Sequence, residues 1–592
     1  MDARPGGEKG GSMAASDLVV GAVGRGGDGV ILSGELLMAS AASKGLYGYM
    51  VQSYGPQIRG GESSFRARFS VEQVSSPGDF LDILVVFDWA AYEMFSNELV
   101  PKESAFVLFD EDNPVPEGVR LSGTKLAAPF AKLSKSASGS LQAKNMVMVG
   151  ILGGLFGFGA EGIGAGVKKR LAKKGEEVIK KNLEAFEAGF SYGTANATEA
   201  AGKIGLEYSP GPPKLVLSGN EALALGALHA GCRFYAGYPI TPSSEILEFM
   251  GKNMWKFGGS FIQAEDELAS IGMVLGASFG GTKAMTATSG PGFSLMTEML
   301  GLGSMMEIPA VIVDVQRTGP STGIPTKSEQ SDLWQAVFGT HGDAPRVVLA
   351  PSDVEDCFHA AVDAFNISEE YQLPVVILSD QLLAQRKVTL SSLPLDKAVV
   401  GRRTPAEGDA EGGYCRYRLG SEDGVSPMAV PGDPRGIYQT TGLEHNEKGE
   451  PTSSFELHEV MNEKRYRKLK AIAERYRYVR RYGASEPEVG ILAWGSSKGA
   501  IKEAVAKANA KGRKVAAFIP ELLYPFPKHE LEAFLKPLKK VVIIELSYAA
   551  QFYKYLKTFL DLPEERVILK KRSGGAFLGV SEVEAAIEEA LK

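Results

Sequence analysis

The sequence predicts an α/β protein built from several doubly wound parallel sheets. Along three stretches, short apolar runs typical of buried strands alternate with amphipathic helical patterns, and such alternation favours parallel sheets with crossover helices. The chain has 592 residues, too many for one hydrophobic core, so several domains are expected. Its 44% hydrophobic and 23% charged residues are ordinary for a soluble globular protein.

The first alternating stretch predicts a domain over residues 17–200. The residues before it, 1–16, are Gly-rich and polar without the apolar core of a signal peptide, so we expect a flexible tail. Lys168–Ala188 has the pattern of an amphipathic helix. The strands expected in this domain are Leu18–Val23, Ile83–Phe87 and Ala105–Phe109.

Two further domains are expected, over 215–395 and 485–592. The strands expected in the first of them are Cys232–Ala236, Lys283–Thr288, Ala310–Val315, Arg346–Leu349 and Val375–Ser379. Those expected in the second are Val489–Trp494, Lys514–Ile519 and Val541–Glu545.

Between these domains, the sequence of residues 396–484 predicts a long irregular segment followed by a basic helix. Lys464 to Arg481 carries nine Lys or Arg residues against one Glu. We interpret it as a solvated or subunit-facing helix; the alternative is a nucleic-acid-binding stripe, which the net charge of −7 disfavours.

Composition also narrows the location and the cofactors. No apolar run approaches the roughly 18 residues of a membrane span, so no membrane partner and a cytoplasmic location are expected. Cys232, Cys357 and Cys415 are isolated in sequence, and the chain therefore lacks the four paired thiols of an iron–sulfur site. We expect these cysteines to pack as small hydrophobes, and the scattered histidines predict no metal site.

The segment Tyr238 to Ser244 carries the strongest functional signal. It follows an expected strand and opens an expected helix, with Pro242 suited to the first helical position and Thr241 to the N-cap. A hydroxyl there, at the positive end of a helix and the carboxyl edge of a sheet, is placed to bind a substrate carboxylate. An ordinary capped helix is the alternative.

Four motifs in order resemble the 2-oxoacid:ferredoxin oxidoreductases, which split 2-oxoacids with thiamine diphosphate, coenzyme A and iron–sulfur clusters. The resemblance is greatest to the α subunit of the 2-oxoglutarate enzymes, with a γ domain fused at the N-terminus. The motifs are Gly219-Asn220-Glu221-Ala222, Tyr238-Pro239-Ile240-Thr241-Pro242-Ser243-Ser244, Thr288-Ser289-Gly290-Pro291-Gly292 and Gln316-Arg317-Thr318-Gly319.

The resemblance implies modules, a reaction and partners. Residues 17–200 would be γ-like, 215–395 would bind the thiamine pyrimidine, and 485–592 would resemble a transketolase C-terminal domain. The implied reaction is oxidative decarboxylation with coenzyme A, which passes electrons to ferredoxin. A β subunit, in an (αβ)2 assembly, would carry the Mg²⁺–diphosphate site and a [4Fe-4S] cluster. The Gly-Asp-Gly around Asp28 begins a magnesium motif, but the first Asn after it is Asn97, too distant to complete that motif.

Glu267 is the expected catalytic carboxyl. Thiamine diphosphate needs a carboxyl hydrogen-bonded to its aminopyrimidine ring, and this group should be buried with a raised pKa. The small, apolar helix after Glu267 aligns it with the family's carboxylate, with Glu265 and Asp266 as alternatives. An acidic helix start favoured by the dipole would need no catalytic role. The family's motifs also assign Tyr238, Pro239, Ser289 and Gly290 to thiamine diphosphate.

Cationic residues are expected around the substrate. Arg317 ends an expected strand, where its guanidinium can bind a carboxylate with two hydrogen bonds, and a mobile loop is expected after it. Lys327 and Arg59 are expected to neutralise a second carboxylate, which favours 2-oxoglutarate over pyruvate or branched-chain 2-oxoacids. Arg59, on a Gly-rich loop, has a structural salt bridge as its alternative.

The loop of Gly24, Gly27, Asp28 and Gly29 follows a strand and precedes a helix. It resembles a dinucleotide fingerprint but lacks the later acidic residue, so NAD is not expected. The resemblance assigns these residues to coenzyme A, and a tight turn is the alternative.

Two other classes of protein remain open. Gly495-Ser496-Ser497-Lys498-Gly499 lies between a strand and a helix, as a serine hydrolase elbow would, with Glu521 and His529 after it. A scaffold subunit without catalytic activity is the other alternative.

Overall fold

The computed structural model describes residues 17–592 except 56–59, 158–159, 199–205, 207, 394, 396–397 and 407–412. The predicted tail and Arg59 therefore lie outside the described residues. The chain forms two compact units, Met1–Val216 with Lys387–Ser392, and Leu217–Arg386 with Leu393–Lys592. None of the described helices is both long and apolar enough to cross a bilayer.

An eight-stranded sheet organises the first unit, in the order β6-β5-β4-β1-β3-β2-β14-β7. Its strands are β1 (Asp17–Gly24), β2 (Tyr47–Tyr54), β3 (Ser63–Ser70), β4 (Leu81–Val86), β5 (Pro101–Asp110), β6 (Thr124–Ala128), β7 (Leu215–Ser218) and β14 (Lys387–Leu390). The three predicted strands are confirmed as β1, β4 and β5. However, β3 pairs antiparallel with both β1 and β2, because the link between β2 and β3 is too short for a crossover helix.

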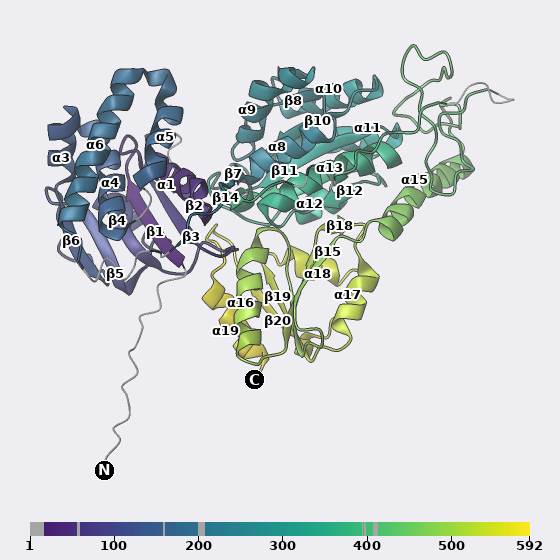
Figure 1. Cartoon of the computed structure of the whole chain (residues 1–592). Helices are drawn as coiled ribbons and strands as arrows, with labels where there is room; N and C mark the ends of the chain where they lie inside the picture. The colour runs from purple at the N-terminus through teal and green to yellow at the C-terminus, as the bar shows by residue number, and fades with distance from the viewer. Residues whose placement is uncertain are drawn as a thin grey trace. The chain divides into compact units, whose positions relative to one another are not determined.

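Helices cover both faces of this sheet. One face packs against α1 (Val30–Ser43), α3 (Phe130–Ser138), α4 (Lys144–Phe156), α5 (Ala160–Leu171) and α6 (Glu176–Ala195), as Figure 1 shows. The other packs against α2 (Trp89–Phe95). The single helix predicted over Lys168–Ala188 was wrong, since Gly175 (φ 89°) separates α5 from α6.

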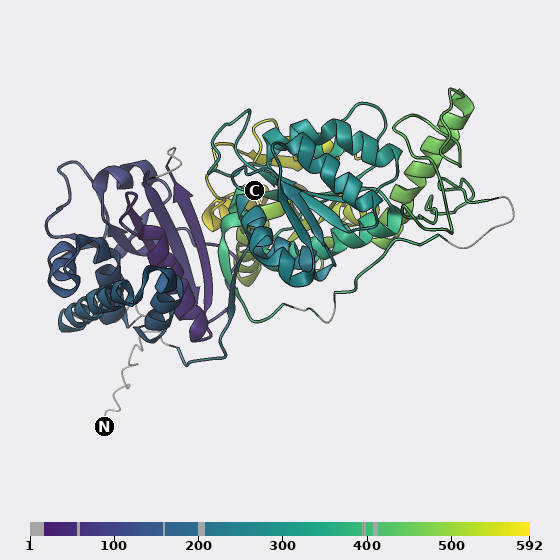
Figure 2. The ribbon, with the colours of Figure 1, turned by 90° about the horizontal axis from the view of Figure 1, so that it is seen from above.

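The second unit contains a seven-stranded sheet in the order β18-β12-β13-β11-β10-β8-β9. It is parallel except for β18 beside β12, and Figure 2 shows helices on both sides of it. The strands are β8 (Phe234–Gly237), β9 (Ser260–Gln263), β10 (Ala284–Thr288), β11 (Ala310–Gln316), β12 (Val347–Leu349), β13 (Pro374–Asp380) and β18 (Leu522–Tyr524). The helices are α8 (Gly219–His229), α9 (Ser244–Asn253), α10 (Glu267–Phe279), α11 (Gly290–Met305), α12 (Leu333–Phe338), α13 (Val354–Tyr371) and α14 (Gln381–Gln385).

A five-stranded sheet completes the second unit, in the order β15-β17-β16-β19-β20. Its strands are β15 (Val479–Gly483), β16 (Val489–Leu492), β17 (Val515–Pro520), β19 (Lys540–Glu545) and β20 (Val567–Lys571), flanked by α16 (Lys498–Ala510), α17 (Lys528–Leu535), α18 (Gln551–Leu556) and α19 (Val580–Ala590). One apolar core runs from α10 and α11 through α12 to α17 and α18, so the two sheets share a core. The α/β prediction is confirmed, with parallel pairing dominant.

The basic helix is α15 (Phe455–Arg475). The interpretation of it as solvated or subunit-facing was wrong for one face, where Lys464, Arg465 and Lys468 are at most 2% exposed. The reason is an internal counter-charge, since Glu307 accepts hydrogen bonds from both lysines.

Candidate active site at the carboxyl edge of the seven-stranded sheet

Thr241 lies in a turn after β8 and does not cap a helix. The Thr241–Pro242 peptide is cis, and α9 begins only at Ser244. The predicted N-cap was wrong because Asn220, buried in α8, donates to the Pro242 carbonyl oxygen (2.9 Å) and holds the turn outside the helix. Thr241 is nevertheless exposed at the carboxyl edge of the sheet.

Arg317 follows β11 and meets this turn. Its Nη1 donates to the Thr241 carbonyl oxygen at 2.6 Å. The side chain is 7% exposed, and its Nε has no hydrogen-bond partner among the described residues. Burial lowers the pKa of Arg317, while Asp332 opposes that shift. The structure thus brings together two residues that the sequence predicts for substrate binding.

Glu267 is the first residue of α10 and is 5% exposed. Burial raises its pKa, Asp266 adds to the rise, and a hydrogen bond with Thr288 opposes it. A Cβ on Gly292 would lie 2.4 Å from Glu267 Oε1 and 2.1 Å from Thr288 Oγ1. Only glycine at position 292 therefore leaves room for this carboxyl group, and the burial expected of a catalytic carboxyl is present.

The first turn of α11 adds an unpaired polar group beside Glu267. Ser289 is the N-cap residue, yet its buried Oγ makes no hydrogen bond to the described residues. A carboxyl group of raised pKa, the free hydroxyl of Ser289 and a glycine-lined helix start fit the aminopyrimidine end of thiamine diphosphate. Tyr238 and Pro239 are exposed beside them.

The segment after Arg317 is a closed loop. The Thr318 amide donates to the Lys327 carbonyl oxygen (2.9 Å) and the Ile324 amide donates to the Thr318 carbonyl oxygen (3.0 Å). Gly323 has φ 53°, and a Cβ there would overlap the Thr318 carbonyl oxygen. Lys327 is half-buried at the end of this loop.

The glycine loop of the first unit joins β1 to α1. Asp28 Oδ2 accepts from the Arg25 amide (2.8 Å), which closes the loop on itself. Gly27 (φ 100°) has open space where a side chain would be, and Gly29 (φ 68°) precedes α1. These φ values require glycine, so a tight turn explains the loop locally, and its coenzyme A role stays a prediction.

Comparison with known proteins decides the family. The thiamine-binding model of the pyruvate flavodoxin/ferredoxin oxidoreductases matches residues 225–464, the pyruvate ferredoxin/flavodoxin oxidoreductase model matches 19–192, and core domain II of pyruvate:ferredoxin oxidoreductase matches 487–583. The 2-oxoglutarate oxidoreductase subunit KorA of Mycobacterium tuberculosis is 34% identical over 90% of this chain and 86% of its own. The chain belongs to the 2-oxoacid:ferredoxin oxidoreductase family.

Two further members of the family agree with this result. The 2-oxoglutarate synthase subunit KorA of Methanocaldococcus jannaschii is 38% identical over 63% of this chain and 98% of its own. A solved structure of 2-oxoglutarate:ferredoxin oxidoreductase from Magnetococcus marinus, with 2-oxoglutarate, coenzyme A and succinyl-CoA bound, superposes with a TM-score of 0.91 at 37% identity, over 98% of this chain and 100% of that one. The resemblance first seen in the four sequence motifs is confirmed.

The geometry of this oxidoreductase chain contradicts the serine hydrolase alternative. Ser497 is 2% exposed, and its Oγ has no hydrogen-bond partner among the described residues. The His529 side chain is 94% exposed and lies beside Glu532. Glu521 instead accepts from Arg480. The three residues therefore do not form a triad.

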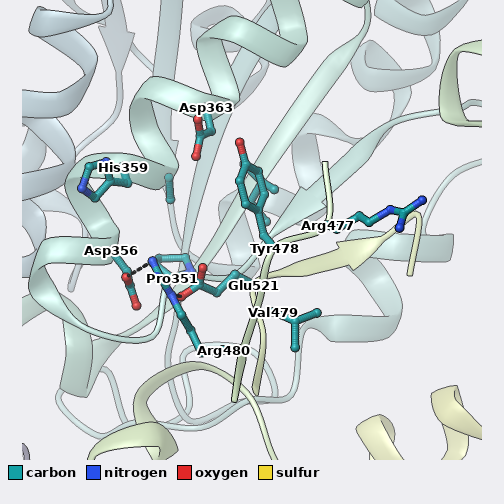
Figure 3. A pocket seen from close by; sticks show the side chains of 11 residues that line it. Pro351, Asp356, His359, Asp363, Arg477, Tyr478, Val479, Arg480 and Glu521 are labelled. Carbon is teal, nitrogen blue, oxygen red and sulfur yellow. Dashed lines mark hydrogen bonds and ion pairs between the residues drawn. The ribbon is translucent and has the colours of Figure 1, made fainter. Parts of the chain in front are cut away.

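A separate cavity of about 510 Å³ lies between α13 and β15 in this oxidoreductase chain. In Figure 3 the Tyr478 hydroxyl points toward Asp363, and Arg480 reaches Asp356. Glu521 and Asp356 are both paired with Arg480. Of the residues that line this cavity, only Glu521 was named from the sequence as a candidate catalytic residue, and none of the described residues expected to bind thiamine diphosphate, coenzyme A or the 2-oxoacid lies there.

Sequence reasoning missed three polar residues near these groups, of which Asn220 and Asp314 are buried and Asp332 is half-buried. Asn220 stands in one of the motifs, but its hold on the turn of Thr241 is visible only in the structure. Asp314 interrupts the apolar strand Ala310–Gln316, and such an interruption is a readable signal. Asp332 had no comparable signal, because it precedes a short helix in a polar stretch.

Proposed function

We propose that this chain is the α subunit of a 2-oxoglutarate:ferredoxin oxidoreductase, which converts 2-oxoglutarate and coenzyme A to succinyl-CoA and CO2 and reduces ferredoxin. The observation that carries the proposal is the buried Glu267, of raised pKa, on the same sheet edge as Arg317 and Thr241. The similarity to the Magnetococcus marinus enzyme supports the choice of substrate and of coenzyme A.

Each residue has a defined task in this proposal. Glu267 exchanges a proton with the aminopyrimidine ring, a role suited to a carboxyl group of raised pKa. Tyr238, Pro239, Ser289 and Gly290 contact the same cofactor. When bound, thiamine diphosphate would supply the nucleophilic carbon needed for decarboxylation of a 2-oxoacid. Arg317 and Thr241 bind and orient the carboxylate that leaves as CO2.

Partners complete the enzyme. A β subunit would hold Mg²⁺ with the cofactor diphosphate and a [4Fe-4S] cluster, because this chain lacks both motifs. Gly24, Gly27, Asp28 and Gly29 would contact coenzyme A through their backbone amides. We place the (αβ)2 assembly and its ferredoxin in the cytoplasm.

A split site predicts that the chain alone is inactive. Purified without partners, it should contain no iron and show no reduction of methyl viologen with 2-oxoglutarate and coenzyme A. Co-expression with the β subunit should restore both the iron and the activity. Turnover by the lone chain, after iron analysis excludes a contaminating partner, would refute the division of labour.

Substrate preference tests the second carboxylate. The co-expressed complex should have a kcat/KM for 2-oxoglutarate at least tenfold above that for pyruvate or 2-oxoisovalerate, since an unpaired carboxylate loses several kcal/mol. Lys327→Met should lower kcat/KM for 2-oxoglutarate but not for pyruvate or 2-oxoisovalerate, so the preference for 2-oxoglutarate should become smaller. Lys252→Met, an exposed residue of α9, is the control. A preference for pyruvate would overturn the substrate but not the oxidoreductase class.

A further inference from the structure

Two carboxyl groups without hydrogen-bond partners lie close to the first turn of α11, Asp314 fully buried and Asp332 half-buried with a buried Oδ2. Asp314 in β11 is 0% exposed, pairs in register with Thr288 of β10, and neither of its carboxyl oxygens has a hydrogen-bond partner among the described residues. Asp332, just before α12, has an equally unpartnered Oδ2, which lies 2.8 Å from the position of a Cβ on Gly290. These carboxyl groups have no assigned role in the proposed mechanism.

The two groups share one electrostatic environment. Burial raises the pKa of Asp314 well above its usual range, and Asp332 raises it further. Burial also raises the pKa of Asp332 to about 6, Glu329 adds to this rise, and Arg317 opposes it. Two adjacent carboxylates without bonded cations cannot both ionise in a buried site, so the pair holds at least one proton near neutral pH.

The surrounding charges tie this pair to Arg317. The other acidic groups around it are Glu267 at the start of α10, Asp380 at the end of β13, which accepts from Ser328 and Leu383, and Glu329, which accepts from Gly574. The Asp332 amide donates to Gln316 Oε1 (3.0 Å), the residue before Arg317, and the charge of Arg317 lowers the pKa of Asp332. Before substrate binds, an ionised Asp332 balances the positive charge of Arg317. A substrate carboxylate that approaches Arg317 would be repelled by this ionised Asp332.

We propose that Asp314 and Asp332 form a charge-compensating pair, which takes up one proton from solvent when a 2-oxoacid carboxylate binds Arg317 and releases it when that carboxylate leaves. This rests on the proposed role of Arg317 in binding the substrate. In the second step the bond to the carboxylate breaks, CO2 departs, and the electron pair stays on the former 2-oxo carbon. The negative charge beside Arg317 is then gone, so Asp332 returns its proton to solvent. Both residues are positioning residues, since they act through Arg317.

The pair makes substrate binding depend on pH. In the unaltered complex, KM for 2-oxoglutarate should rise as the pH increases from about 6 to about 8, by up to tenfold per pH unit, because binding requires a proton that becomes scarce. In Asp332→Asn this rise should disappear. At pH 8 the variant should bind substrate more tightly than the unaltered complex, because the anion that repels the substrate carboxylate is absent. Its kcat should change by less than about threefold, because Asp332 acts through Arg317 and does not take part in the chemical step.

Stability supplies a readout that is independent of turnover. A carboxyl group whose folded pKa lies above its unfolded value binds more protons when folded, so its contribution to stability is present at low pH and is lost as the pH rises through its folded pKa. For Asp332 this loss occurs between about 4 and about 6, and for Asp314 it extends to higher pH. Asp314→Asn and Asp332→Asn should therefore raise the melting temperature of the complex at pH 8 and flatten its pH dependence. Carboxylates with a purely structural role would give lower melting temperatures instead.

Both measurements use the co-expressed complex and one matched control. Glu298→Gln removes an exposed carboxylate from the same helix, α11, and should leave both readouts unchanged. Higher melting temperatures together with a flat KM profile would support the proposal. Lower melting temperatures in both Asn variants, or an unaltered KM profile in Asp332→Asn, would overturn it. If the complex does not turn over 2-oxoglutarate at all, the proposed function fails, whereas the stability test of the pair still stands.

Discussion

Glu267→Gln should reduce turnover of the complex by about 10²-fold or more, the scale of general acid–base catalysis, while the fold is preserved. Glutamine has the shape of glutamate, so it fills the space that Gly292 leaves, but it cannot exchange a proton with the aminopyrimidine ring. Burial of Glu267 with a raised pKa is the arrangement expected of a group that does so. The measurements are kcat with 2-oxoglutarate and hydrogen exchange at the thiazolium carbon, with circular dichroism to verify folding.

The neighbouring acidic residues provide the controls. Glu265 is exposed, so Glu265→Gln should stay within about twofold of the unaltered enzyme, as expected of a surface change. Asp266 is already occupied as the N-cap of α10, where its Oδ1 accepts from the Ala269 amide at 2.7 Å. Near-normal exchange at the thiazolium carbon in Glu267→Gln would show that the catalytic carboxyl lies elsewhere.

Most strands were predictable because their sequences are apolar and bounded by turn residues. Ala310–Val315 and Val375–Ser379 became the fully buried, adjacent strands β11 and β13. The strand β3, which pairs antiparallel with its neighbours, was not predicted. In its sequence, Ser63–Ser70, apolar residues alternate with polar and charged ones. That alternation is the pattern of a half-buried strand, yet here Arg66 is buried and bonds to the Gly78 carbonyl oxygen.

Local rules failed where a distant residue decides the outcome. A Thr-Pro before a helix predicts an N-cap, but the turn of Thr241 is held by Asn220 from another helix. Similarly, a run of basic residues predicts a solvated helix. In α15 one face is buried instead, because Glu307, distant in sequence, accepts hydrogen bonds from its lysines. Glu267 and Arg317 could be proposed as site residues from the sequence because their motifs resemble a family, whereas the unpartnered carboxyl groups of Asp314 and Asp332 are visible only in the structure.

The buried carboxylate beneath α15 is Glu307, which follows α11. Its oxygens accept from Lys464 Nζ (2.7 and 2.6 Å) and from Lys468 Nζ (2.5 Å), and its carbonyl oxygen accepts from Arg416 (2.6 Å). Burial alone would raise the pKa of Glu307, but the surrounding cations hold it well below its usual range. Stability from this group is therefore present above its unfolded pKa and is lost as the pH falls below it.

Glu307→Gln should destabilise the second unit by about 3–5 kcal/mol, because removing one partner leaves buried charges uncompensated. Lys468, whose pKa burial already lowers to about 7, would lose its only carboxylate neighbour within hydrogen-bond distance among the described residues. The measurement is urea unfolding of the whole chain, combined with limited proteolysis of α15. Easier cleavage of α15 would locate the destabilisation at this helix.

A double-mutant cycle separates the charge cluster from simple packing. Lys468→Met removes the excess cation, so the pair Glu307→Gln with Lys468→Met should recover part of the stability that Glu307→Gln loses, since coupled neighbours are not additive. The control is Glu248→Gln on α9. Glu248 forms an exposed ion pair with Lys252 at 3.2 Å, so this change should lower the free energy of unfolding by no more than about 0.5 kcal/mol. Additive losses in the double variant would mean that Glu307 stabilises α15 through its shape rather than its charge.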